Sequence, residues 1–192
     1  MDFFNYQKQV VPVNGDLLIS EPMLPDPNFE RTVILLCEHN EEGSIGFVLN
    51  KPSVLSFEEA IEGVKGFKAP LYIGGPVQQD TLHFIYRGEM DLEGTVDVTD
   101  EIGWGGNFEQ LLTMMNNGSI QMENFRFFIG YSGWSPGQLD EELKQKSWIV
   151  VHGATASHIF DTNPDELWKK LLEDMGVKFK IFSNYPVDPR MN

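Results

Sequence analysis

The chain has 192 residues, of which 41% are hydrophobic and 12% aromatic, so it is not a globally disordered protein. Its formal charge of −15 and the lack of any basic run predict no direct binding to nucleic acid, whose phosphates are held by clustered cations. The single cysteine excludes an internal disulfide and a multi-cysteine zinc site, and we expect a cytoplasmic protein with no metal and no cofactor.

Membrane insertion is not expected, because no apolar run approaches the roughly 20 residues that a spanning helix needs. The first residues also lack the basic stretch and apolar core of a secretory signal. Proline and glycine are spread along the chain as turn residues, and no linker or repeat is visible. We therefore predict one domain over residues 1–192, with a core from about 15 to 183 and peripheral segments 1–14 and 184–192.

Short β-strands are expected first. Residues 16–20, 32–39 and 44–50 are apolar and β-rich, and the turn at 40–43 predicts that the last two form a hairpin. The three prolines within residues 21–27 exclude a helix there, since proline removes a backbone donor and restricts its predecessor.

Helices and strands are expected to alternate through the middle of the chain. Ser56 and Glu59 match a capping box, which predicts a helix from Ser56 to about Val64. A second helix is expected over residues 108–115. The strands expected in this region are residues 71–73, 82–86, 95–98 and 125–131.

The C-terminal third is expected to contain two helices and two strands. Ser135 as N-cap, Pro136 as the first helical residue and Gln138 as the partner in a capping box predict one helix. A second helix is expected from Asn163 to a stop at Gly176. The strands expected here are residues 148–151 and 177–182. The early hairpin leaves no room for a crossover helix, so we predict an α+β fold: one compact domain with a mostly antiparallel central sheet flanked by short helices.

Several motifs, taken in order, resemble the YqgE/AlgH family of bacterial proteins. They are Asp26-Pro27-Asn28-Phe29-Glu30-Arg31-Thr32-Val33, Cys37-Glu38-His39, Gly46, Asn50-Lys51-Pro52, Gly74-Gly75-Pro76-Val77, Gly130-Tyr131-Ser132-Gly133-Trp134, Gly137-Gln138-Leu139 and Leu167-Trp168. The resemblance implies a bacterial cytosolic α+β domain with no established catalytic residue, substrate or cofactor. One branch of the family carries a transcription-regulator label, which implies at most an indirect influence on transcription here, because the charge opposes contact with DNA.

Two nucleophiles are the catalytic alternatives. Cys37 and His39 are two residues apart in a predicted strand, which places both side chains on one sheet face. Three interpretations of Cys37 follow: a core residue, a redox-responsive thiol whose pKa a nearby imidazolium lowers, or a catalytic nucleophile. Ser132 follows a strand and precedes a helix, as in a nucleophile elbow, but Trp134 stands where that motif requires glycine. We interpret neither residue as catalytic and keep a hydrolase-like or redox-responsive enzyme as the alternative.

A non-catalytic regulatory or binding module, with an unknown protein or small molecule as partner, is therefore our leading hypothesis. The loops after Asn50, Gly74 and Tyr131 are expected to border one concave patch. The proposed ligand-binding residues are Arg31, Asn50, Lys51, Gly74, Gly75, Tyr131, Ser132, Gly133 and Gln138. We interpret the glycines of Gly103-Trp104-Gly105-Gly106 as turn residues, and the acidic stretch at 88–125 as a solvated face or, alternatively, a docking surface for a basic partner.

Overall fold

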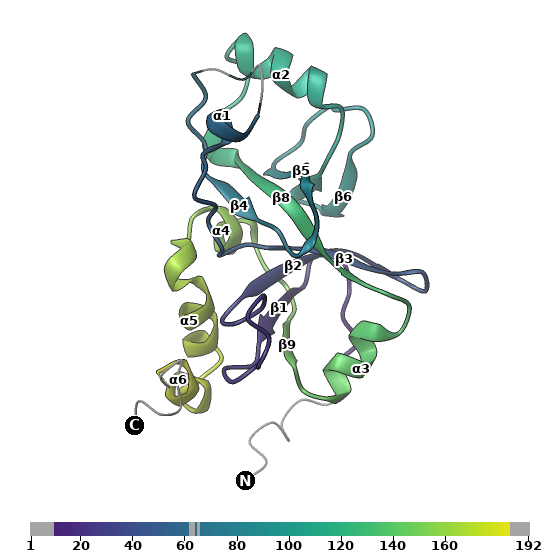
Figure 1. The fold of residues 1–192 in the computed structure, drawn as a ribbon, viewed down its shortest axis with the longest axis vertical. Helices are drawn as coiled ribbons and strands as arrows, with labels where there is room; N and C mark the ends of the chain where they lie inside the picture. Colours follow the sequence, from purple (N-terminus) through teal and green to yellow (C-terminus); the bar gives the residue numbers. More distant parts are fainter. Residues whose placement is uncertain (1–9, 62–63, 65, 185–192) are drawn as a thin grey trace.

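The computed structural model describes residues 10–61, 64 and 66–184, and its strands form one sheet (Figure 1). Eight of its nine strands are ordered β6-β7-β5-β8-β3-β2-β1-β9, and the ninth, β4, pairs with β8 beside this path. Every pairing is antiparallel except that of β4 with β8. The strands are β1 (Leu17–Ser20), β2 (Val33–Asn40), β3 (Gly43–Val48), β4 (Leu71–Ile73), β5 (Val77–Arg87), β6 (Val96–Thr99), β7 (Ile102–Trp104), β8 (Phe125–Trp134) and β9 (Trp148–Val151).

Strand β8 joins the two halves of the molecule. Its first residues pair with β5, and Ser132 to Trp134 pair with β3. Gly130 separates these two stretches and has a φ of 65°, a conformation that glycine adopts without strain. In Figure 1, β8 crosses the centre of the molecule, with β5 and β6 on its upper side and β1, β2, β3 and β9 below.

Helices cover the sheet on both halves. They are α1 (Phe57–Ala60), α2 (Phe108–Asn116), α3 (Gln138–Lys144), α4 (Ala156–Phe160), α5 (Pro164–Asp174) and α6 (Val177–Ser183), with a 3-10 turn at Met122–Asn124. The upper half buries α1 and α2 against Phe125 and Phe127 of β8. In the lower half, α5 packs on one sheet face and α3 on the other. Each large apolar side chain buried in this way contributes about 1.5–3 kcal/mol.

The predicted fold class and most predicted elements are confirmed. The β2–β3 hairpin forms, α1 carries the expected capping box at Ser56, and α5 begins after Asn163. Helix α1 ends earlier than expected, at Ala60, and residues 62 and 63 lie outside the described part of the chain. Among the described residues, no helix combines the length and apolar character needed to cross a bilayer.

The strand predicted at residues 177–182 is wrong, because this segment is the helix α6. A strand would have placed Val177, Phe179 and Ile181 on one face. Instead Phe179 and Phe182, three residues apart, pack toward the core, while Val177 and Ile181 are exposed. The segment lies against α5 and not at a sheet edge.

Helix α3 begins two residues later than predicted. Its N-cap is Gly137, whose φ of 75° breaks the helical path, so neither Ser135 as N-cap nor Pro136 as first helical residue is correct. Part of the expected capping interaction survives, because the Ser135 backbone N–H donates to Gln138 Oε1 at 3.0 Å. Helix α4, capped by Thr155, and strand β7 were not predicted.

Candidate functional site

Cys37 and His39 do not share a sheet face, so that prediction is wrong. Leu36 pairs with Gly46 and Glu38 pairs with Ile45, which leaves Cys37 as an extra residue in β2. Such a bulge shifts the alternation of side chains by one position. Cys37 is fully buried in the core beside α5, whereas His39 lies opposite Ser44, and His39 Nδ1 is 2.7 Å from Ser44 Oγ.

We expect the Cys37 thiol to be inert in the folded protein. It has no exposed surface, and burial raises its pKa well above the usual range. An aromatic disulfide reagent should therefore react with one thiol per chain in guanidinium chloride and with almost none, over minutes, in the native state. His39→Ala should leave the native rate unchanged. Fast native labelling that depends on His39 would contradict the geometry.

Ser132 is also buried, and its hydroxyl has a structural partner. The residue is 0% exposed, and Ser132 Oγ donates to the Gly74 carbonyl at 3.0 Å. Within the described residues no histidine hydrogen-bonds to it. The bond ties β8 to the chain that follows β4, which gives this hydroxyl a role in positioning the strands.

The other predicted ligand-binding residues have separate positions. Asn50 Oδ1 accepts from the Val33 N–H at 2.9 Å, and Asn50 Nδ2 donates to the Arg31 carbonyl at 2.8 Å. Lys51 Nζ donates to the Pro27 carbonyl at 3.4 Å and to that of Asn28 at 3.2 Å.

Tyr131 and Gly133 line a hollow of about 480 Å³ beside the β2–β3 hairpin. Gln138 instead bonds to Glu142 within α3, at 2.9 Å. Of the loops after Asn50, Gly74 and Tyr131 that were expected to border one concave patch, the last two contribute to this hollow, through Val77 and through Tyr131 and its neighbours. No described residue from the loop after Asn50 lines it.

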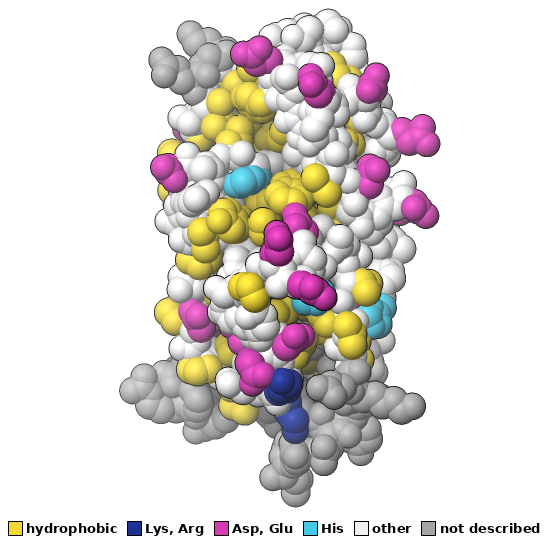
Figure 2. Space-filling model, turned by 90° about the vertical axis from the view of Figure 1, so that its right-hand side faces the viewer, with side chains coloured by type: hydrophobic (Ala, Val, Ile, Leu, Met, Phe, Trp, Pro, Cys, Tyr) yellow, Lys and Arg dark blue, Asp and Glu magenta, His cyan; other side chains and the backbone are white. Residues whose placement is uncertain are grey.

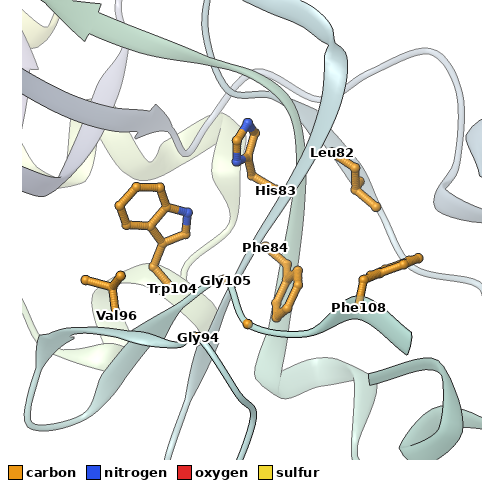
Figure 3. A pocket seen from close by; sticks show the side chains of 9 residues that line it. Leu82, His83, Phe84, Gly94, Val96, Trp104, Gly105 and Phe108 are labelled. Carbon is orange, nitrogen blue, oxygen red and sulfur yellow. The ribbon is translucent and has the colours of Figure 1, made fainter. Parts of the chain in front are cut away.

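A different cavity has the clearest form of a binding site. It measures about 450 Å³ and lies between β5, the β6–β7 pair and the start of α2 (Figure 3). Its described lining is mainly apolar: His83, Trp104 and Val96 lie on one side of β5, and Leu82, Phe84 and Phe108 lie on the other. His83 is the one ionisable group among these described residues. Small-molecule sites typically have this size and this apolar character.

The glycines around Trp104 give the cavity its backbone wall. A Cβ atom at Gly103 would lie 2.4 Å from the Tyr86 ring, so only glycine fits at that position of β7. Gly105 and Gly106 have φ values of 70° and 114°, and the Gly105 N–H donates to the Phe84 carbonyl at 2.9 Å. The chain thereby turns from β7 into α2. Gly105 and Gly106 are turn residues, as expected, and this turn lines the cavity, whereas Gly103 belongs to the strand β7 and is not a turn residue.

Aromatic packing fixes His83 and Trp104 in place. Both rings contact the fully buried Phe47, with centroid distances of 5.2 Å for His83 and 5.6 Å for Trp104. The ring of Tyr131 meets His83 edge-on at 5.8 Å, which connects this cavity with the hollow at the hairpin. Partial burial lowers the pKa of His83, so the neutral imidazole is favoured at pH 7.

None of the described residues that line the cavity is acidic, lysine or arginine. Figure 2 shows the face toward which β6 and the hairpin point: hydrophobic side chains gather in its middle, and acidic side chains are scattered over it. Lysine and arginine side chains are visible only at the lower end of that face. Among the described residues, no group of three or more histidine, cysteine or acidic side chains is arranged to hold a metal ion.

Comparisons with known proteins place the chain in a family. Residues 17–180 match the model of a family described as AlgH-like. The chain belongs to the AlgH-like family. A UPF0301 protein of Cytophaga hutchinsonii is 45% identical to it over 93% of this chain and 98% of the relative. The UPF0301 protein CT0663 of Chlorobaculum tepidum is 44% identical over 93% of this chain and 95% of the relative.

Two solved structures share the fold. The AlgH protein of Pseudomonas aeruginosa, with 30% identity, gives a TM-score of 0.71 and covers 94% of this chain and 98% of its own. Protein DIP2367 of Corynebacterium diphtheriae gives a TM-score of 0.75 at 22% identity, covering 95% and 97%, and its likeness shows the fold alone. None of these names states a reaction or a ligand, so the AlgH-like chain's activity has to be argued from its cavities.

Proposed function

We propose that this AlgH-like chain is a non-catalytic, cytoplasmic binding module that takes a small organic molecule into the cavity between His83, Trp104 and Phe108. The observation that carries the proposal is the cavity itself: about 450 Å³ lined mainly by apolar residues, with few polar groups. The single cysteine supports a reducing compartment, and any influence on transcription would pass through ligand binding and not through DNA contact.

The enzyme alternative draws no support from the two nucleophiles. Cys37 and Ser132 are both 0% exposed, and neither lies beside an imidazole that could take its proton. A binding role requires neither an exposed nucleophile nor a general base. Aromatic rings held rigidly by Phe47 can stack on a planar ligand with little loss of side-chain entropy.

Filling the mouth of the cavity tests the proposal. Val96 lines the cavity and is 41% exposed on the edge strand β6, so Val96→Trp should occlude it without disturbing the core. Saturation-transfer NMR with indole, isoquinoline and 1-isoquinolinone should detect binding to the wild type, and we expect Val96→Trp to weaken it by tenfold or more, about 1.4 kcal/mol.

Val54→Trp is the matched control, because Val54 is 100% exposed and does not line this cavity. It should leave binding unchanged, and both variants should unfold at nearly the wild-type temperature. If the wild type binds none of the three compounds, or if both variants bind them as the wild type does, the cavity is not the ligand site.

A further inference from the structure

The hydrogen bonds of His83 define which of its ring nitrogens faces a ligand. Thr81 Oγ1 donates its single proton to the Gln78 carbonyl at 2.8 Å, and it also lies 3.0 Å from His83 Nε2. Since the hydroxyl proton is already used, Nε2 must be the donor in the second contact. In the neutral imidazole, Nδ1 is then a hydrogen-bond acceptor, and within the described part of the chain no donor is bonded to it.

Trp104 supplies the complementary group. Of the four tryptophans, Trp134, Trp148 and Trp168 are buried and donate their indole N–H to Glu142, Glu142 and the Ser20 carbonyl, respectively. The Trp104 N–H has no acceptor among the described residues, and its ring is partly exposed. Figure 3 shows the Trp104 indole and the His83 ring as neighbours, with a nitrogen of each directed toward the space between them.

The charge around the site restricts the ligand further. Among the residues that the structure describes, no lysine, arginine or carboxylate lines the cavity, and the chain carries a net charge of −15. An anionic ligand would meet a repulsive field with no cation to hold it, and a cation would find no carboxylate partner within the cavity. An uncharged molecule meets neither cost.

We infer that the ligand is an uncharged, planar heterocycle that presents a hydrogen-bond donor and an acceptor on one edge, as a lactam or a pyrimidinone does. Its N–H donates to His83 Nδ1, its carbonyl accepts from the Trp104 indole, and its ring packs beside Val96, which lies opposite Trp104 on the same sheet face. This inference rests on the proposed binding function and specifies the class of ligand for the same cavity.

A set of four bicyclic probes tests the assignment. 1-Isoquinolinone carries the donor and the acceptor side by side, isoquinoline has only the acceptor, indole has only the donor, and 1-naphthoate is an anion. We expect 1-isoquinolinone to bind the wild type about tenfold more tightly than isoquinoline or indole, because each of these leaves one protein group without a partner. 1-Naphthoate should bind most weakly.

Two variants assign the preference to its residues. Trp104→Phe keeps an aromatic ring but removes the indole N–H, so it should abolish the preference for 1-isoquinolinone over indole. His83→Phe removes the acceptor, so it should abolish the preference over isoquinoline. Circular dichroism and thermal unfolding establish that each variant is folded, and if one is not, the wild-type ranking of the four probes decides alone.

The possible outcomes distinguish a failure of this ligand assignment from a failure of the proposed binding function. Binding of all three uncharged probes with equal affinity, blocked by Val96→Trp, would support the cavity and overturn the donor–acceptor assignment. Tighter binding of 1-naphthoate than of 1-isoquinolinone would overturn the requirement for an uncharged ligand. Failure of every probe to bind would remove the proposed function itself.

Discussion

Replacing Glu142 with leucine is expected to destabilise the fold by about 3 kcal/mol. Trp134 Nε1 and Trp148 Nε1 both donate to Glu142 Oε2, at 2.9 Å and 2.7 Å, and the two tryptophans are only 6% and 3% exposed. Leucine would leave two buried indole N–H groups with no acceptor, each costing about 1–3 kcal/mol. Since domains of this kind are stable by about 5–15 kcal/mol, urea unfolding will resolve the loss easily.

Glu141 provides the matched control on the same helix. It is exposed, and its carboxylate contacts Lys144 Nζ at the surface, 2.6 Å away. Exposed ion pairs of this type contribute little, so Glu141→Leu should leave the urea midpoint nearly unchanged. Glu142→Gln keeps one acceptor oxygen without the charge and should fall between the two. Equal midpoints for the two leucine variants would show that the contact of Glu142 with the indoles contributes no stability.

Local signals in the sequence were sufficient for much of the fold. Helix α5 begins where Asn163 accepts from the Asp165 N–H and Pro164 occupies the first turn, and the four buried residues of its apolar stripe pack on β1 and β2. The β2–β3 hairpin follows from two apolar runs joined by a short turn. In each case, residues a few positions apart determine both the element and its ends.

The bulge at Cys37 shows where periodicity stops being informative. A strand's alternation predicts faces only if no residue is inserted, and nothing in the run Leu36-Cys37-Glu38 marks the insertion, which depends on pairing with β3. The same reasoning explains α6. Val177 to Phe182 alternates as a strand does, but packing against α5 favours a helix that buries Phe179 and Phe182.

The candidate site was missed for a related reason. His83 and Trp104 are brought together by the pairing of β5 with β7, where Ile85 lies opposite Trp104, and this register cannot be read from either segment alone. A search for nucleophiles and metal ligands also passes over a site made of aromatic rings and glycines. The run Gly103-Trp104-Gly105-Gly106 was the available signal, since an aromatic residue held between glycines can be presented to a ligand by the backbone.

Gly74→Ala is expected to have the second large effect, a loss of about 3 kcal/mol of stability. The backbone of Gly74 accepts from the Val48 N–H at 2.9 Å and donates to the Ile129 carbonyl at 2.9 Å, so it holds β3, β4 and β8 together. A Cβ atom here would lie 2.3 Å from the Gly130 carbonyl oxygen and 3.1 Å from Phe128 Cβ. A backbone atom on one side and a core side chain on the other leave no direction in which the methyl group could be accommodated.

Gly137→Ala is the control that distinguishes steric crowding by the added methyl group from the strain of a positive φ. Gly137 has a φ of 75° and open space around its missing Cβ, so alanine there should cost only the strain of the left-handed conformation, about 1 kcal/mol. Gly74→Ala should therefore lower the urea midpoint substantially more than Gly137→Ala does. Equal losses of stability in the two variants would mean that β4 and β8 can move apart at low cost. The close backbone contact between Gly74 and Gly130 would then not determine the position of β8.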